Sequence, residues 1–123
     1  MPKLLVIDND ASFREFMTLA LTLEGYDVQS VADGETALDV LNNRALDLVL
    51  LDLSMPNLNG WDVLRRIREI PTLQSVKVVI ITANADEETR RRSVHERIDA
   101  LLIKPLSLEE ILTVLRSVLS QGP

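Results

Sequence analysis

The 123-residue sequence has no cysteine, one histidine and few aromatic residues: one tryptophan, one tyrosine and two phenylalanines. Without cysteine there is no disulfide framework, no thiolate metal site and no cysteine nucleophile. The single histidine, His95, lies in a polar stretch, so we expect it to be exposed. No apolar run approaches the roughly 18 residues of a membrane span, and the N-terminal MPKLLVID reaches an acidic residue too early for a signal peptide. These absences predict a soluble cytoplasmic protein with no membrane partner.

Positive charge is also in short supply, with 13 basic residues against 19 acidic ones and a net charge of −6. An acidic surface repels a phosphate backbone, so we expect no direct binding to nucleic acid. The one basic cluster, residues 90–92, follows two glutamates, an order that suits the dipole of a helix. We interpret it as a solvated helix face.

Five apolar runs suit strands of a sheet. They lie at residues 4–7, 26–31, 48–51, 76–81 and 100–103, and the second of them is weaker and alternating. An uninterrupted apolar run is typical of a strand that is buried on both faces.

The stretches between and after these runs have helical spacing, at residues 13–25, 35–41, 60–70, 87–97 and 107–119. The first is expected to stop at Gly25 and the third before Pro71, whose ring cannot continue a helix. The fourth is nearly all polar. In the fifth, Ser107 and Glu110 form a capping box. The first helix is predicted to bury Phe13, Phe16, Met17, Ala20 and Leu21.

The alternation of five strands with five helices predicts right-handed crossovers and a parallel sheet with helices on both faces. The fold class is therefore an open, doubly wound α/β domain. We expect one domain over residues 1–119, a frayed tail over residues 120–123, and no output domain in this chain.

Two of the buried strands run directly into a carboxylate, Asp8 after LLVI and Asp52 after LVLL. Such positions lie at the edge where α/β sheets bind ligands. Two carboxylates that face one another repel unless they are protonated or bridged by a cation. Oxygen ligands without sulfur or clustered histidine favour Mg²⁺ or Ca²⁺, and a site with few carboxylates favours Mg²⁺.

Two further strand ends carry polar groups, the hydroxyl of Thr82 and the ammonium of Lys104, which Pro105 follows. A nucleophilic carboxylate, a metal, a hydroxyl and a cation together suit phosphoryl transfer to the carboxylate.

The acid and hydroxyl after Asp8 also have a structural interpretation. Asp10 or Ser12 could cap the helix that follows, and Ser12 with Glu15 fits the S-x-x-E capping box. Asp8 itself lies too early in the chain to be a cap, so capping does not explain it.

Together these motifs resemble the response-regulator receiver family, the CheY-like domains, over essentially the whole chain. The resemblance rests on VIDND, LLDLSMPNLNG, VIITA and IKP, in that order. It implies a flavodoxin-like (βα)5 fold with strand order 2-1-3-4-5. It also implies that Asp52 accepts a phosphoryl group from a sensor histidine kinase or a histidine phosphotransfer protein, with Mg²⁺ bound. The implied residues are the metal ligands Asp8, Asn9, Asp52 and the Ser54 backbone carbonyl, with Asp10 as an additional candidate, the phosphoryl-binding and switch residues Thr82, Ala83 and Lys104, and a cis bond before Pro105.

Two positions depart from the family pattern. Asn9 replaces the second of two adjacent acids, which predicts weaker Mg²⁺ binding unless Asp10 coordinates the ion. Leu101 stands where a tyrosine or phenylalanine usually acts as the switch, so a signal is expected to travel through Thr82 and the fourth helix. The surface of the fourth helix, fifth strand and fifth helix would then bind a downstream output protein or domain, or a second copy in a homodimer.

Two alternatives stay open at this point. LLVIDNDAS also resembles the start of haloacid-dehalogenase-like phosphatases, with Asp8 as nucleophile and Asp10 as acid, but the chain lacks their late acidic motif and Asp52 would have no role. A receiver fold that has Asn9 and Leu101 could instead be a phosphorylation-independent interaction module. We favour a phosphoacceptor regulatory domain over an enzyme, with at most self-catalysed phosphorylation and dephosphorylation.

Overall fold

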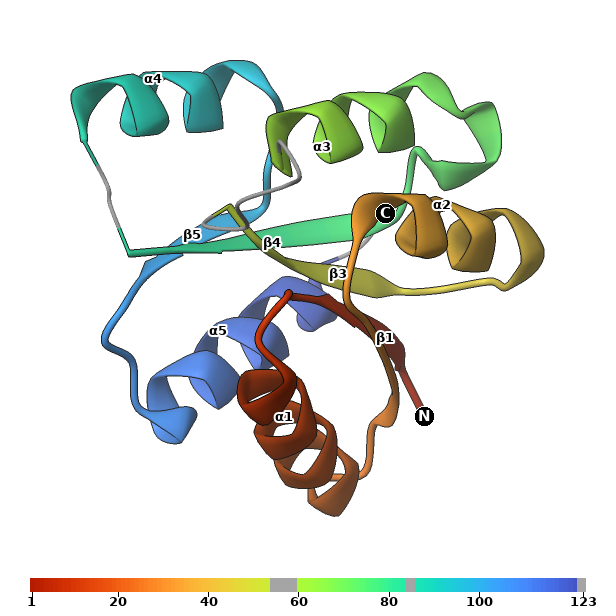
Figure 1. The fold of residues 1–123 in the computed structure, drawn as a ribbon, viewed down its shortest axis with the longest axis vertical. Coiled ribbons are helices and arrows are strands. Elements are labelled where there is room, and N and C mark those ends of the chain that lie inside the picture. Colours follow the sequence, from red (N-terminus) through yellow and green to blue (C-terminus); the bar gives the residue numbers. More distant parts are fainter. Residues whose placement is uncertain (54–59, 84–85, 122–123) are drawn as a thin grey trace.

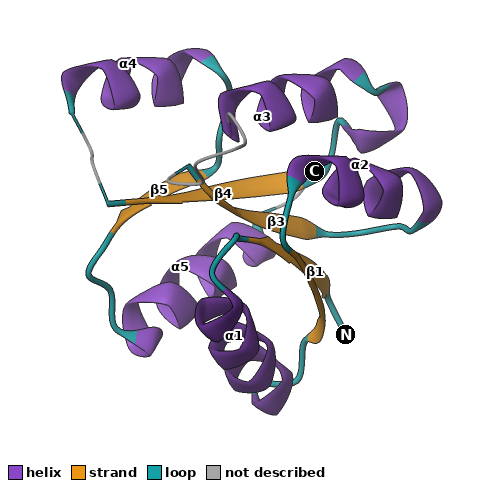
Figure 2. Ribbon diagram, in the orientation of Figure 1, coloured by secondary structure: helices purple, strands orange, loops and turns teal. Residues whose placement is uncertain are grey.

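The computed structural model describes residues 1–53, 60–83 and 86–121. Over these residues strands and helices alternate as predicted (Figures 1 and 2). The elements are β1 (Lys3–Ile7), α1 (Ala11–Leu23), β2 (Asp27–Val31), α2 (Gly34–Asn43), β3 (Leu48–Asp52), α3 (Gly60–Glu69), the 3₁₀ helix η1 (Pro71–Leu73), β4 (Lys77–Thr82), α4 (Glu87–His95), β5 (Ala100–Ile103) and α5 (Leu108–Ser120).

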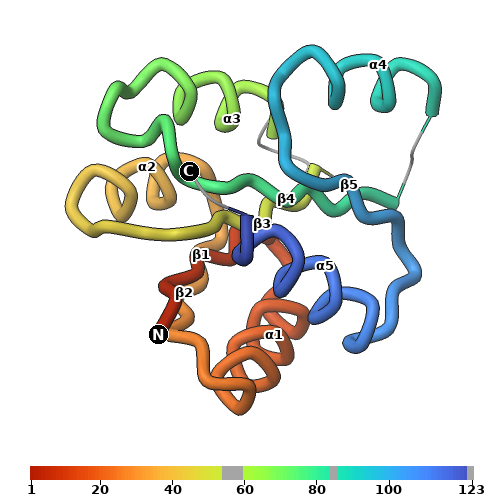
Figure 3. Tube along the Cα trace, turned by 180° about the vertical axis from the view of Figure 1, so that it is seen from behind, coloured from red at the N-terminus to blue at the C-terminus, as the bar shows by residue number. Residues whose placement is uncertain are grey.

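The strands form one parallel sheet in the order β2-β1-β3-β4-β5, which confirms the predicted topology. Figure 1 shows α1 and α5 on one face of the sheet and α2, α3 and α4 on the other. From behind, Figure 3 shows β2 beside β1, next to α1. The predicted doubly wound architecture with helices on both faces is therefore confirmed.

Side chains of each central strand alternate between two hydrophobic cores. Leu5 and Ile7 of β1 pack in the core beneath α2 and α3, whereas Leu4 and Val6 pack in the core beneath α1 and α5. All four are essentially inaccessible to solvent. Burial on both faces explains why these strands read as uninterrupted apolar runs rather than alternating ones.

Most helix boundaries follow the predicted signals. Gly25 has a φ of 95° and follows the end of α1, and Ser107 and Glu110 form the predicted capping box of α5. The fourth helix ends at His95, two residues earlier than predicted. Its continuation is blocked at Arg97, whose φ of 56° is left-handed and incompatible with a right-handed helix.

One predicted core residue is wrong. Phe16 is 52% exposed, whereas Met17, Ala20 and Leu21 of the same helix are buried. Consecutive helix residues are about 100° apart, so Phe16 lies at the margin of the stripe that faces the sheet. In the described ranges, no helix has both the length and the apolar character needed to cross a membrane.

Candidate functional site

Parallel pairing brings the predicted site residues together along the edge of the sheet that is formed by the carboxyl ends of its strands. Ile7 pairs with Leu51, so Asp8 and Asp52 come next on neighbouring strands. Thr82, the last residue of β4, pairs with Ile103, which precedes Lys104. The backbone N–H of Lys104 donates to the carbonyl of Thr82 at 2.8 Å. The four strand ends therefore converge, as expected from the carboxyl ends of a parallel sheet.

Asp8 is buried at this edge, with 1% of its surface exposed. Its Oδ1 accepts a hydrogen bond from the backbone N–H of Asp10 at 2.9 Å, and its carbonyl accepts one from Arg14 Nη1 at 2.7 Å. Its own N–H donates to the carbonyl of Val31 at 3.2 Å. Its other carboxylate oxygen, Oδ2, is buried and has no hydrogen-bond partner among the described residues.

Lys104 provides the positive charge that faces both carboxylates. Its Nζ lies 3.1 Å from Asp52 Oδ2 and 3.9 Å from Asp8 Oδ2. The ammonium also lies 5.0 Å from the centroid of the Phe13 ring, a cation–π distance that holds it over the site. Because Asp52 is only 4% exposed, its contact with Lys104 is poorly screened by water.

The carboxyl group of Asp8 binds its proton unusually tightly. Burial, with a further contribution from the neighbouring Asp52, raises the pKa of Asp8 from 3.8 to about 6. The backbone N–H of Asp10 and the charge of Lys104 act in the opposite direction and lower the pKa, but they do not offset the rise. The backbone N–H of Asp10 and the ammonium of Lys104 thus do not offset the burial of Asp8 and its repulsion by Asp52.

The excess of negative charge from Asp8 and Asp52 suits a divalent cation. The buried Asp8 Oδ2 lacks a hydrogen-bond donor, and carboxylate oxygens are the ligands that Mg²⁺ prefers. Asn9 is exposed beside it at the rim. Within the described ranges, no group of three or more His, Cys, Asp or Glu side chains could hold a metal, so a bound ion would take the remaining ligands from amide, backbone or water oxygens. The residues fit Mg²⁺ on these terms.

Asp10 has the structural role that the sequence left open. Its Oδ1 accepts hydrogen bonds from the backbone N–H groups of Ser12, at 2.9 Å, and Phe13, at 3.3 Å, and it is the N-cap of α1. Ser12 lies inside the helix, so the alternative of a capping box begun by Ser12 is wrong.

The remaining predicted residues lie around the same edge or next to it. Thr82 is buried at the end of β4, and Ala83 follows it in an exposed position. The Lys104–Pro105 peptide bond is cis. Leu101 is partly buried and packs against the core beneath α2 and α3. Ser54, the predicted carbonyl ligand, lies outside the described residues.

Two contributors were not identified from the sequence. Arg14 binds the Asp8 carbonyl from the first turn of α1, and Phe13 supports Lys104 with its ring. The residue pattern predicts Phe13 as a core residue and gives no signal for Arg14. Both contacts depend on how α1 folds back over the end of β1, which only the structure shows.

Comparisons with known proteins agree with this geometry. A family model described as the response regulator receiver domain matches residues 4–116. The response regulator ArlR of Staphylococcus aureus is 32% identical over 123 residues, which are 100% of this chain and 55% of ArlR. The chain thus spans about half the length of the curated relatives it matches.

Solved structures are similar over nearly the full chain. The non-phosphorylated receiver domain of HemR from Leptospira biflexa has a TM-score of 0.92 and 27% identity, covering 100% of this chain and 98% of its own. The receiver domain of the sensor histidine kinase PA1611 from Pseudomonas aeruginosa has a TM-score of 0.87 and 25% identity, covering 98% of each chain. That structure has a magnesium ion coordinated in its active-site cleft.

Proposed function

This chain belongs to the response regulator receiver domain family, and we propose that it accepts a phosphoryl group from a phosphohistidine onto Asp52. The observation that carries the proposal is the 3.1 Å contact between Lys104 Nζ and Asp52 Oδ2, beside the buried carboxylate of Asp8. The family is regulatory, and its members work with sensor histidine kinases and output domains.

The transfer breaks the P–N bond of a phosphohistidine and forms a P–O bond to the carboxylate, giving an acyl phosphate on Asp52. Asp8 is the poorer nucleophile because its raised pKa keeps part of the population protonated near pH 6 and because Lys104 Nζ lies nearer to Asp52 than to Asp8. Lys104 can hold the negative charge of the phosphoryl oxygens without leaving Asp52. The hydroxyl of Thr82, at the neighbouring strand end, is the proposed switch ligand, with Ala83 beside it.

A magnesium ion at this site would be held by Asp8, Asp52 and the amide of Asn9, with the carbonyl of Ser54 as the proposed fourth protein ligand. When bound, the ion supplies positive charge that offsets the carboxylates and the incoming phosphoryl oxygens. Because Asp10 caps α1 through Oδ1, we propose that it is a structural neighbour of the metal site rather than a ligand. The neutral Asn9 then makes this a weak Mg²⁺ site.

The proposed signalling surface is formed by α4, β5 and α5. Ser93 is the sole buried residue of α4, and Val94 of that helix is 85% exposed. Ile103 of β5 is 38% exposed. A helix with so few buried apolar contacts is cheap to displace, which supports a route from Thr82 to α4 that does not need an aromatic residue at Leu101. An output protein or domain, or a second copy, would bind this surface.

The decisive experiment is intact mass spectrometry after incubation with Mg²⁺ and a small phosphodonor, for the parent, Asp52→Asn and Asp8→Asn. We expect a phosphoryl adduct on the parent that is absent from Asp52→Asn and that peptide mapping places on Asp52. Attachment at Asp8 would instead support the phosphatase-like alternative. A folded parent that forms no adduct under any condition would leave the phosphorylation-independent module as the better account.

A further inference from the structure

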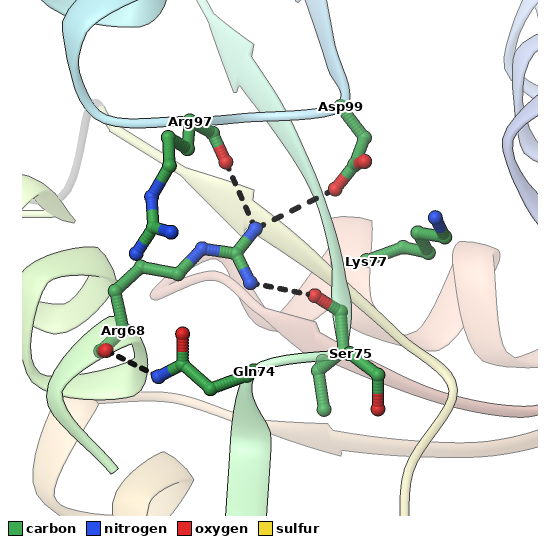
Figure 4. Close-up of a pocket in the computed structure, with 7 residues that line it drawn as sticks. Arg68, Gln74, Ser75, Lys77, Arg97 and Asp99 are labelled. Atoms are coloured by element: carbon green, nitrogen blue, oxygen red, sulfur yellow. Dashed lines mark hydrogen bonds and ion pairs between the residues drawn. The ribbon is translucent and has the colours of Figure 1, made fainter. Parts of the chain in front are cut away.

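A second charged site lies at the opposite side of the sheet, where the strands have their amino ends. This side is called the amino edge below, and the side with Asp8 and Asp52 is called the carboxyl edge. A cavity of about 210 Å³ is lined by Arg68, Gln74, Ser75, Lys77, Arg97 and Asp99 (Figure 4), together with Val76. Lys77 is the first residue of β4 and Asp99 immediately precedes β5, so the cavity lies at the amino ends of these strands. The predicted phosphoacceptor lies at their carboxyl ends. The two sites are therefore separated by the length of the sheet.

Arg97 adopts a backbone conformation that is costly for its residue type. Its φ of 56° is in the left-handed region, which glycine reaches without strain and arginine does not. This conformation lets the carbonyl of Arg97 accept a hydrogen bond from Arg68 Nη2 at 2.9 Å. A glycine would offer the same carbonyl at lower cost. The backbone contact therefore gives no reason for an arginine here, and the explanation must lie in the side chain.

The side chain of Arg97 extends alongside that of Arg68 at the cavity, as Figure 4 shows. Its guanidinium has no hydrogen-bond or ion-pair partner within the described part of the chain. Arg97 is exposed at the cavity, and its charge acts on Arg68 and lowers the pKa of that group, a repulsion that a bound anion would offset. Nothing in the described residues supplies that anion to Arg97.

The charge of Arg68 is only partly compensated in the cavity. Its Nη1 donates to the carbonyl of Val76 at 2.8 Å, and its Nη2 lies 3.6 Å from Asp99 Oδ2. That same Asp99 oxygen already accepts a hydrogen bond from the backbone N–H of Val78 at 2.7 Å. Nε of Arg68 is buried and has no partner in the described residues. Burial lowers the pKa of Arg68, and the charge of Arg97 adds to that effect against the opposing charge of Asp99.

We propose that this cavity binds a small multivalent oxyanion of the phosphate class, held mainly by the guanidinium of Arg97 beside Arg68. Three basic side chains and one carboxylate line it, although the chain as a whole carries a net charge of −6. Guanidinium groups bind phosphate oxygens through two parallel N–H donors, and the guanidinium of Arg97 has no partner among the described residues that would occupy these donors. The oxyanion could be inorganic phosphate or the phosphate group of a small ester. The site is independent of Asp52 and of the proposed phosphotransfer.

The test is an NMR titration with inorganic phosphate at constant ionic strength and without Mg²⁺. We expect saturable amide shifts at residues 74–77 and 97–99, with binding roughly tenfold weaker in Arg97→Gly, because a charge-assisted hydrogen bond is lost. Arg66→Gln removes the same charge from an exposed position of α3 and should bind as the parent does. Equal losses in both variants, shifts confined to residues near Asp52 and Lys104, or no saturable shift would each overturn the proposal.

A thermal unfolding measurement separates the binding role from the strain. Arg97→Gly relieves the left-handed strain, so this variant should unfold at a higher temperature than the parent without phosphate and gain nothing when phosphate is added. The parent should gain stability with phosphate. A variant that still gains as much as the parent would contradict the site. Methyl phosphate as a second probe identifies the source: matching shifts support a phosphoester ligand, and binding of inorganic phosphate alone supports the free anion.

Discussion

The two edges of the sheet carry opposite imbalances of charge. At the carboxyl ends of the strands, Asp8 and Asp52 share the single ammonium of Lys104. At the amino ends, Arg68 is paired with the single carboxylate of Asp99, and Arg97 and Lys77 add two further basic side chains to the same cavity. One edge therefore lacks positive charge and the other lacks negative charge. The proposed ligands have the opposite signs, a cation with a phosphoryl group at the carboxyl ends and an oxyanion at the amino ends.

The edges also differ in what their charged groups do for the fold. Arg68 acts as a strut, meaning that its side chain links α3 to the loops before β4 and β5 by hydrogen bonds to the carbonyls of Val76 and Arg97. Asp52 pairs with Lys104, but burial, with a further contribution from Asp52, raises the pKa of Asp8. The hydrogen bonds of Arg68 stabilise the fold at the amino edge, whereas the burial of Asp8 is a cost at the carboxyl edge, as is typical of functional sites.

Replacing Arg68 with methionine should have the largest effect on stability. The change leaves the carbonyls of Val76 and Arg97 without their donor and leaves Asp99 without its ion pair, so we expect the free energy of unfolding to fall by about 2–4 kcal/mol. Urea denaturation measures it. Arg66→Met, in the same helix but exposed, is the matched control and should change stability by less than about 0.5 kcal/mol. Similar losses in both variants would show that Arg68 is not a strut.

Replacing Asp8 with asparagine should raise the free energy of unfolding rather than lower it. Because the pKa of Asp8 rises from 3.8 to about 6 on folding, the folded state holds this proton more tightly than the unfolded state. The stability of the parent should therefore fall as the pH rises from about 4 to about 6 and stay low above that. Asp8→Asn lacks this group, and without metal it should be more stable than the parent by about 2–3 kcal/mol at pH 7.5, with the difference shrinking towards pH 4.

The control for this comparison is Asp10→Asn, which removes a neighbouring carboxylate whose side chain is exposed and which keeps a capping oxygen. Its stability should follow the pH profile of the parent. Urea denaturation in a chelating buffer at several pH values gives both curves. Parallel curves for the parent and Asp8→Asn would mean that Asp8 is not the group that makes the carboxyl edge costly.

The positions of the charged residues at the carboxyl edge could be predicted from the sequence, and those at the amino edge could not. Strands buried on both faces read as apolar runs, so the first polar residue after each run marks a strand end, as at Asp8, Asp52 and Lys104. Parallel order then places those ends together. The same reasoning predicted the fold and most helix limits, and it failed at Phe16, where periodicity alone does not say how wide a stripe the sheet covers.

The amino edge depends on features that leave no mark in a residue pattern. A residue in the left-handed backbone conformation is usually glycine or asparagine, which makes such positions predictable, but here the residue is Arg97. Arg68 reads as one more polar residue on the exposed side of a helix, and its carbonyl partners are backbone atoms of distant loops. The contact of Arg14 with the Asp8 carbonyl escaped prediction for the same reason.

Replacing Asn9 with aspartate should increase the excess of negative charge at the carboxyl edge. A third carboxylate at the carboxyl edge increases the attraction for a divalent cation, so we expect Mg²⁺ to bind roughly tenfold more tightly. Isothermal titration calorimetry measures the affinity. Asn9→Ser, which keeps an oxygen but no charge, is the control and should not bind more tightly than the parent. An Asn9→Asp variant with unchanged affinity would show that position 9 does not contact the ion.

Variants of Asp10 should have the smallest effect, and they distinguish a helix cap from a metal ligand at this position. Asp10→Ala removes the acceptor for the N–H groups of Ser12 and Phe13, which should lower the free energy of unfolding by about 1 kcal/mol. Asp10→Ser keeps a capping oxygen and should lose much less. Because Asp10 is proposed to cap α1 and not to coordinate Mg²⁺, both variants should bind Mg²⁺ within about twofold of the parent once folded, with loss of a nearby charge as the sole difference. A tenfold loss of Mg²⁺ affinity in both would make Asp10 a ligand and would explain how the site works with a neutral Asn9.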